Sequence, residues 1–140
     1  MAAEQPKADV LCIEDEADMI DLIRWILERQ GYAVRGALGG QEGLRQMREK
    51  RPDVVLLDIM MPEMDGWEVY REMKASPDLQ DIPVVVVTAK AQSIDKVLGL
   101  HIAKVEEYIT KPFGPHELVQ AVEKVLSAAR GQAPEVPAGD

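Results

Sequence analysis

The feature that most constrains the fold is an alternation of short apolar runs with longer amphipathic segments. Three of the five apolar runs are strong and rich in β-branched residues, and they cover residues 10–13, 54–57 and 82–87. The two weaker runs cover residues 32–35 and 105–109. Runs this short, bounded by polar or turn residues, are typical of strands that are buried on both faces of a sheet. Such strands need a covering layer on each side.

The segments between these runs repeat apolar residues at helical spacing. They cover residues 17–30, 40–50, 66–75, 93–104 and 115–130. Gly31 follows the first segment as a helix stop, and Pro115 occupies a favourable first-turn position in the last. Strands that alternate with helices of this length indicate parallel β-α-β units with right-handed crossovers. The chain is therefore expected to be an α/β protein with a doubly wound parallel sheet and helices on both faces.

Length and composition favour one folded domain. The 140 residues are 46% hydrophobic, which is enough apolar material for one core and excludes a wholly disordered chain. We expect a flexible N-terminus over residues 1–7 and a folded domain over residues 8–130. Residues 131–140 are expected to be a disordered tail, because prolines and glycines gather there.

Charge and cysteine content exclude several classes of function. Sixteen Lys and Arg residues against 25 Asp and Glu residues leave a net charge of −9, which repels nucleic-acid phosphates and anionic membranes. The single cysteine, Cys12, excludes an internal disulfide framework and is expected in the core. No segment reaches the roughly 18 apolar residues of a membrane helix, and no secretory signal opens the chain. We expect a cytoplasmic protein.

Polar and charged residues directly follow four of the predicted strands. In an open α/β sheet the ligand crevice lies beyond the carboxyl ends of the strands, so these residues are expected to share one edge. They are Glu14, Asp15 and Glu16 after residues 10–13, Asp58 after 54–57, Thr88 after 82–87, and Thr110, Lys111 and Pro112 after 105–109.

Carboxylates that crowd at one edge repel one another, so a cation is expected among them. Carboxylates without histidines or thiolates favour a hard ion such as Mg²⁺, which also accepts a phosphate oxygen. Lys111 adds a second positive charge, and Thr88 adds a hydroxyl. These groups suit a site that holds a phosphoryl group and transfers it to a carboxylate, forming an aspartyl phosphate.

Four stretches resemble the receiver domains of two-component response regulators, which have the CheY-like, flavodoxin-like fold. They are residues 10–16 (VLCIEDE), 56–66 (LLDIMMPEMDG), 87–89 (VTA) and 108–113 (YITKPF). The resemblance extends over about residues 8–127. It implies five parallel strands in the order 2-1-3-4-5 with five helices. It also implies a phosphoacceptor domain that is not an enzyme but assists its own phosphorylation and dephosphorylation.

The resemblance assigns a role to each matching position. Asp58 is expected to be the phosphoacceptor. Mg²⁺ ligands are expected from Asp15, from Asp58 and from the backbone carbonyl of Met60. Glu14 is expected to act beside them, directly or through water.

Further positions are expected to bind the phosphoryl group or to shape the site. Thr88 and Lys111 would bind phosphoryl oxygens, and Tyr108 would change rotamer when Thr88 moves. Pro112 would follow a cis peptide bond. The Asp65-Gly66 pair would shape the turn beside the site.

The resemblance implies a phosphorylation-dependent switch in a two-component phosphorelay. A histidine kinase or a histidine phosphotransfer protein would supply the phosphoryl group. The surface of the fourth helix, fifth strand and fifth helix would then change its docking to an unknown protein target. We expect a monomer or a weak dimer, with no direct binding of nucleic acid or membrane.

Other functions remain as alternatives at this stage. The domain is either a working receiver or a pseudo-receiver that binds partners without phosphorylation, and it is either free-standing or a fragment of a longer regulator. An aspartate-nucleophile phosphatase is disfavoured because Met60 stands where such enzymes usually place a second aspartate. A flavodoxin is disfavoured because the acidic residues at 14–16 would repel the flavin phosphate.

Two positions depart from the family pattern. Lys104 stands where a helix-ending glycine is usual, so the pattern does not predict the backbone there. Ala121 stands where the transcription-factor branch usually has an arginine that pairs across a dimer. This substitution weakens the expectation of that dimer.

Overall fold

The computed structural model describes residues 5–89 and 105–131, which form five strands and four helices. The strands are β1 (Asp9–Ile13), β2 (Ala33–Ala37), β3 (Val54–Asp58), β4 (Val84–Thr88) and β5 (Glu107–Thr110). The helices are α1 (Ala17–Glu28), α2 (Gly40–Glu49), α3 (Gly66–Ala75) and α5 (Pro115–Ala129). The fifth predicted helix, over residues 93–104, lies outside the described residues.

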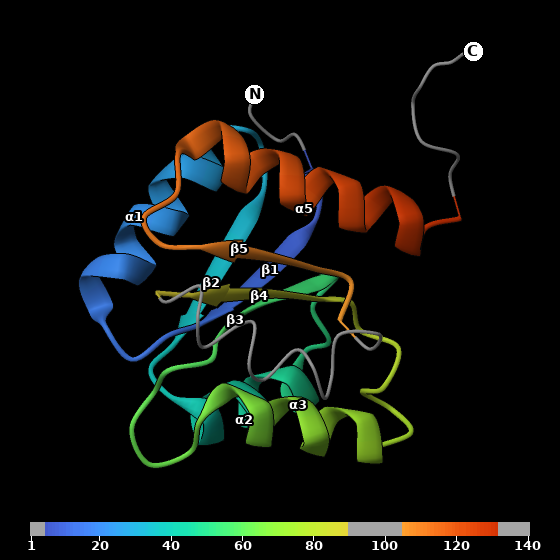
Figure 1. Ribbon diagram of the computed structural model, residues 1–140. Helices are drawn as coiled ribbons and strands as arrows, with labels where there is room; N and C mark the ends of the chain where they lie inside the picture. Colours follow the sequence, from blue (N-terminus) through green and yellow to red (C-terminus); the bar gives the residue numbers. More distant parts are fainter. Residues whose placement is uncertain (1–4, 90–104, 132–140) are drawn as a thin grey trace.

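The five strands form one parallel sheet in the order β2-β1-β3-β4-β5. Helices α1 and α5 cover one face of the sheet, and α2 and α3 cover the other (Figure 1). This arrangement confirms the predicted doubly wound sheet and its strand order. In the described part of the chain, no helix is both long and apolar enough to cross a membrane.

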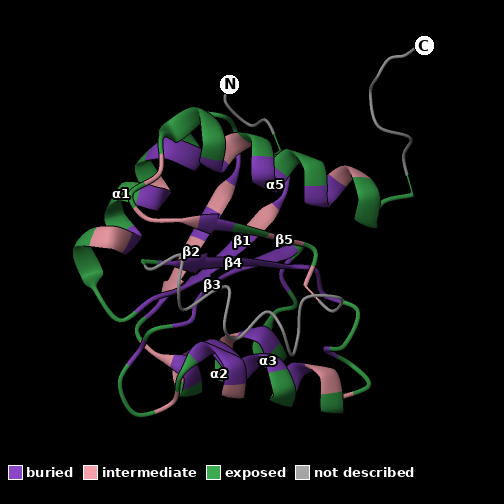
Figure 2. Cartoon of the chain, in the orientation of Figure 1, coloured by how far each residue is buried: buried purple, intermediate pink, exposed green. Residues whose placement is uncertain are grey.

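The sheet separates two apolar cores (Figure 2), because successive residues of a strand point to opposite faces. In β1, Val10 and Cys12 belong to the core under α1 and α5, whereas Leu11 and Ile13 belong to the core under α2 and α3. Every residue of β3 and β4 is buried. Burial, together with the charge of Glu14, raises the pKa of the Cys12 thiol to about 12. Cys12 is therefore a core residue, as predicted.

Strand boundaries differ from the prediction by one or two residues. β4 begins at Val84 because the preceding residue, Pro83, has no amide hydrogen to donate to a neighbouring strand. β5 begins at Glu107, two residues later than expected. Just before it, the Glu106 side chain accepts the Val84 amide at 2.8 Å, so a carboxylate satisfies the first amide of β4.

Residues near both ends of the described chain form hydrogen bonds with the folded domain. The Lys7 amide donates to the Gly31 carbonyl at 2.8 Å, and the Arg130 guanidinium donates to the Lys7 carbonyl at 2.8 Å. Lys7 is therefore attached to the domain. Residues 1–4 and 132–140 lie outside the described residues, so the expected flexible ends stay predictions.

Helix α3 begins very close to the end of β3. Asp65 caps the helix, since its side chain accepts the Glu68 amide while the Glu68 side chain accepts the Asp65 amide, both at 3.0 Å. The Gly66 amide donates to the Ile59 carbonyl at 3.0 Å. A Cβ on Gly66 would lie 2.4 Å from the Asp58 carbonyl oxygen and 2.7 Å from the Ile59 Cα. Only glycine lets the helix approach the strand end this closely.

Gly66→Ala is expected to lower the free energy of unfolding by about 1–3 kcal/mol, because the added methyl group overlaps backbone atoms of the β3 end. Urea unfolding followed by circular dichroism measures the change. Gly114→Ala at the N-cap of α5 is the matched control, because a Cβ there meets no atom within 4 Å. It should cost less than about 1 kcal/mol. Equal losses in the two variants would contradict the close approach of α3 to β3.

Candidate functional site

The carboxyl ends of four neighbouring strands place charged and polar side chains at one edge of the sheet. Glu14 and Asp15 follow β1, Asp58 and Thr88 are the last residues of β3 and β4, and Lys111 follows β5. One carboxylate oxygen each from Glu14, Asp15 and Asp58 lie within 4.8 Å of one another. The sheet therefore brings together acidic residues that are far apart in the sequence.

The acidic cluster of Glu14, Asp15 and Asp58 is largely buried. Glu14 is 1% exposed and Asp58 is 3% exposed, whereas Asp15 is open to solvent. Glu14 Oε2 and the hydroxyl oxygen of the buried Thr88 have no hydrogen-bond partner among the described residues. Buried polar atoms are unfavourable unless water or a ligand satisfies them. These two atoms are therefore left for water or a bound group to satisfy.

Among the residues that the structure describes, Lys111 is the cation that contacts the cluster. Its ammonium donates a hydrogen bond to Glu14 Oε1 at 2.8 Å and lies 3.8 Å from Asp58 Oδ2. Burial lowers the pKa of Lys111, but the hydrogen bond to Glu14 and the charge of Asp58 outweigh burial and raise the pKa above its ordinary value. Lys111 is thus a permanent cation between the two buried carboxylates.

Asp58 is subject to opposing influences. Burial and the neighbouring charge of Glu14 raise the pKa of the Asp58 carboxyl group to about 7, although Lys111 and the Met60 amide act to lower it. The Met60 amide donates to Asp58 Oδ1 at 3.1 Å and fixes one carboxylate oxygen. Lys111 therefore does not fully compensate the buried negative charge of the described carboxylates.

The donor set of the cluster fits a hard divalent cation. Three carboxylates supply oxygen ligands, and no histidine or cysteine is among them. Among the residues that the structure describes, the three carboxylates face the ammonium of Lys111, which balances only part of their negative charge, and a divalent ion would supply further positive charge. The unpartnered oxygen of Glu14 and the exposed carboxylate of Asp15 are available as ligands. The cluster is therefore a candidate Mg²⁺ site.

The remaining predicted site residues surround the cluster in different ways. The Thr88 carbonyl accepts the Lys111 amide at 2.7 Å, which joins the ends of β4 and β5. The Lys111–Pro112 peptide bond is cis, as predicted. Met60 is 49% exposed, and the aromatic ring of Tyr108 in β5 is also accessible, with 45% of the residue exposed. Asp65 and Gly66 lie at the start of α3.

Sequence reasoning did not predict the pairing of Lys111 with Glu14. The two residues are 97 positions apart, and their only shared signal is that each follows a strand. Of the two departures from the family pattern, Lys104 lies outside the described residues. Ala121 is buried in the core under α5. At this position α5 therefore presents no side chain that reaches a partner.

The sequence matches a known protein family and a curated relative. Residues 10–123 match the response regulator receiver domain family. The alkaline phosphatase synthesis transcriptional regulatory protein PhoP of Bacillus subtilis (strain 168) is 36% identical over 125 residues, which cover 89% of this chain and 51% of PhoP. The chain thus spans about half the length of that relative.

Two solved structures have the same fold over nearly their whole length. The signal receiver domain of a signal transduction histidine kinase from Syntrophus aciditrophicus matches with a TM-score of 0.80 and 32% identity, covering 94% of this chain and 98% of that one. The chemotaxis protein CheY4 of Vibrio cholerae matches with a TM-score of 0.76 and 26% identity, covering 84% and 98%. The fold and the acidic cluster at the sheet edge agree with the family match, which extends over most of the chain. The chain belongs to the response regulator receiver domain family.

Proposed function

We propose that this receiver domain is a phosphorylation-dependent switch whose phosphoacceptor is Asp58. The observation that carries the proposal is the setting of the Asp58 carboxylate, which is nearly buried within the acidic cluster and lies 3.8 Å from the Lys111 ammonium. The hydroxyl of Thr88 adds support, because it is a buried hydrogen-bond donor that has no acceptor in the described part of the chain. These groups together suit transfer of a phosphoryl group onto a carboxylate.

Mg²⁺ is the proposed cofactor of the reaction. Asp15, Asp58 and the backbone carbonyl of Met60 would be its direct ligands, with Glu14 acting directly or through water. When bound, Mg²⁺ neutralises negative charge on the phosphoryl oxygens and on the carboxylates that face them. Without that neutralisation the acidic cluster would repel the incoming phosphoryl group.

The residues of the chain have distinct parts in the transfer. An Asp58 oxygen attacks phosphorus while the bond from phosphorus to the donor breaks, and the departing donor group takes a proton from solvent. The Met60 amide orients the Asp58 carboxylate through its bond to Oδ1. The Lys111 ammonium, held by Glu14, and the Thr88 hydroxyl donate hydrogen bonds to the phosphoryl oxygens.

Phosphorylation is proposed to change the conformation of the surface through Thr88 and Lys111. The phosphate adds a charge of about −1.5 to −2 near neutral pH and attracts both donors. Because the Lys111 amide is bonded to the Thr88 carbonyl, the ends of β4 and β5 are coupled. Tyr108, half exposed in β5, then changes rotamer and alters the surface of β5 and α5. Phosphorylation thereby shifts an existing equilibrium between two conformations.

The proposed phosphoryl donor is a histidine kinase or a histidine phosphotransfer protein, and the proposed downstream target is a protein. The net charge of −9 argues against direct contact with nucleic acid. PhoP is described as a transcriptional regulatory protein, and this chain spans about half of it. We therefore propose a cytoplasmic regulatory domain, monomeric or weakly dimeric, that works alone or within a longer regulator.

Incubation with acetyl phosphate and Mg²⁺ is expected to add one acid-labile phosphate to the wild-type protein and none to Asp58→Asn, because an amide cannot form the acyl phosphate. Intact-mass spectrometry before and after acid treatment measures the incorporation. Asp81→Asn is the matched control, since Asp81 is exposed and precedes β4 at the opposite end from the cluster. It should incorporate phosphate like the wild type. Wild-type incorporation in Asp58→Asn would reject the assignment.

Asp15→Asn is expected to weaken Mg²⁺ binding at least about tenfold, because it removes a charged oxygen ligand from the cluster. Glu16→Gln removes one carboxylate from the neighbouring position outside the cluster and should weaken binding by less than about twofold. Isothermal titration calorimetry with MgCl₂ compares the two variants. Equal losses of affinity would show that Asp15 acts only through its general negative charge.

Asp58→Asn is expected to raise the unfolding temperature of the metal-free protein at pH 8 by at least about 3 °C. The pKa of Asp58 is raised from 3.8 to about 7 in the folded protein, so the wild type loses stability as pH rises between these two values, and the loss is nearly complete at pH 8. At pH 5 the folded wild type is protonated at Asp58, and the difference should shrink. Thermal unfolding at both pH values provides the measurement.

Mg²⁺ should reverse this order of stability at pH 8, because it binds the wild-type cluster more tightly than the variant cluster. The same unfolding experiment with saturating MgCl₂ tests this. A variant that is less stable than the wild type without metal, or a difference that grows toward pH 5, would contradict the account of the buried carboxylates.

A further inference from the structure

The sheet has a free edge at β2. This strand stands at one end of the strand order, and among the described residues it pairs with β1 alone. The Ala33 amide donates to the Ala8 carbonyl, so Ala33 turns its backbone polar groups toward β1. The backbone N–H and C=O groups of successive residues point alternately to the two sides of a strand, so those of Val34 and Gly36 point away from β1. Their two carbonyls are positioned to pair with another strand.

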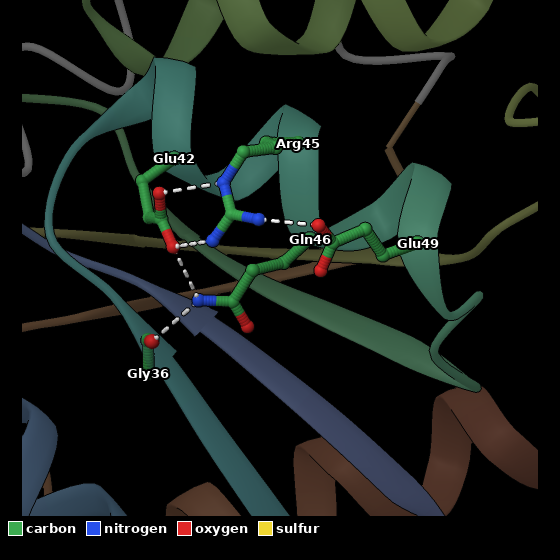
Figure 3. Close-up of polar contacts among 5 residues, drawn as sticks. All are labelled: Gly36, Glu42, Arg45, Gln46 and Glu49. Carbon is green, nitrogen blue, oxygen red and sulfur yellow. Dashed lines mark hydrogen bonds and ion pairs between the residues drawn. The ribbon is translucent and has the colours of Figure 1, made fainter.

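Side chains from two helices bind both outward carbonyls. Gln46 of α2 donates from Nε2 to the Gly36 carbonyl at 3.0 Å (Figure 3). Arg24 of α1 donates from Nε to the Val34 carbonyl in a longer contact of 3.5 Å. Helices α1 and α2 lie on opposite faces of the sheet, so the two side chains reach the edge from both sides (Figure 1).

A network on α2 holds Gln46 in its bonding position (Figure 3). The Gln46 amide also donates to Glu42 Oε2 at 3.0 Å. Glu42 is in turn held by Arg45, which pairs with Glu49 one turn further along the helix. The Gln46 amide nitrogen therefore has two fixed acceptors, a side chain of its own helix and the edge of the sheet.

Arg24 is held in a similar way on α1. Its guanidinium lies 3.5 Å from Asp21 and 3.9 Å from Glu28. A Cβ on Gly36 would lie 2.5 Å from Ile20 Cγ2 and 3.6 Å from Arg24. The absence of a side chain at Gly36 thus lets α1 lie against the edge strand with Arg24 beside the Val34 carbonyl.

We propose that Arg24 and Gln46 close the β2 edge against pairing with a second copy of this chain. An unpaired edge strand is a template for another strand, and natural proteins block such edges. A second copy is the occupant that fits, because two β2 strands around a two-fold axis present the same outward groups of Val34 and Gly36 to each other. The proposal does not depend on phosphorylation.

The test compares Arg24→Ala/Gln46→Ala with Arg71→Ala/Gln120→Ala, which removes the same side chains from exposed positions of α3 and α5. Light scattering after size-exclusion chromatography, over a series of protein concentrations, gives the dimer Kd. We expect the edge variant to dimerise with a Kd at least about tenfold below that of the control variant and the wild type. Hydrogen exchange should slow at the amides of Val34 and Gly36 in the dimer.

An edge variant that stays monomeric wherever the control variant does would overturn the proposal. Association with unchanged exchange at β2 would also overturn it, because another surface would then form the dimer. If the double variant loses its cooperative unfolding transition, Gln46→Leu is compared with Gln120→Leu, since leucine keeps much of the side-chain volume without the amide donor. A Gln46→Leu variant that associates no more than Gln120→Leu would count against the proposal in the same way.

Discussion

Among the described residues, two buried carboxylates share the ammonium of Lys111 at the carboxyl edge of the sheet, and the other properties of the site depend on that incomplete balance. Glu14 bonds Lys111 directly, while Asp58 lies a further ångström away and has a raised pKa. Burial of charge is unfavourable unless it is compensated, so the domain keeps an electrostatic strain at this edge. A divalent cation bound to the acidic cluster would relieve this strain. The feature that destabilises the isolated domain is therefore the feature that prepares it for its proposed ligand.

The fold makes this strain tolerable by holding the carboxylates on stiff elements. β1, β3 and β4 lie between two apolar cores, so the residues at their ends have little freedom to move apart. Gly66 lets α3 lie against the end of β3, and the Met60 amide fixes one oxygen of Asp58. The Lys111 amide bonds the Thr88 carbonyl, so the end of β5 is coupled to the end of β4. The buried strands thus hold the residues of the proposed phosphoryl site in place, and the bond between the ends of β4 and β5 is proposed to transmit the effect of phosphorylation.

Much of the fold and the membership of the acidic cluster could be predicted from the sequence, because both follow from periodicity and from the position of strand ends. Pro83 and Glu106 changed the strand boundaries, since an absent amide and a side-chain acceptor are not part of an apolar pattern. The Lys111–Glu14 pair could not be predicted, because it depends on the direction of side chains that leave two non-adjacent strands. The closure of the β2 edge depends on how two helices cross the sheet, and no local pattern encodes that.

Asp58, its acidic neighbours, Thr88 and Lys111 are proposed to form one site for Mg²⁺ and a phosphoryl group. A crystal structure of the protein with Mg²⁺ and beryllium fluoride, a phosphoryl mimic, would show whether they do. We expect beryllium bonded to an Asp58 oxygen, Mg²⁺ against Asp15 and Asp58, and fluorides within hydrogen-bond distance of the Thr88 hydroxyl and the Lys111 ammonium. A structure at the same ligand concentrations with both ligands absent from this edge, or with the mimic bound elsewhere, would contradict it.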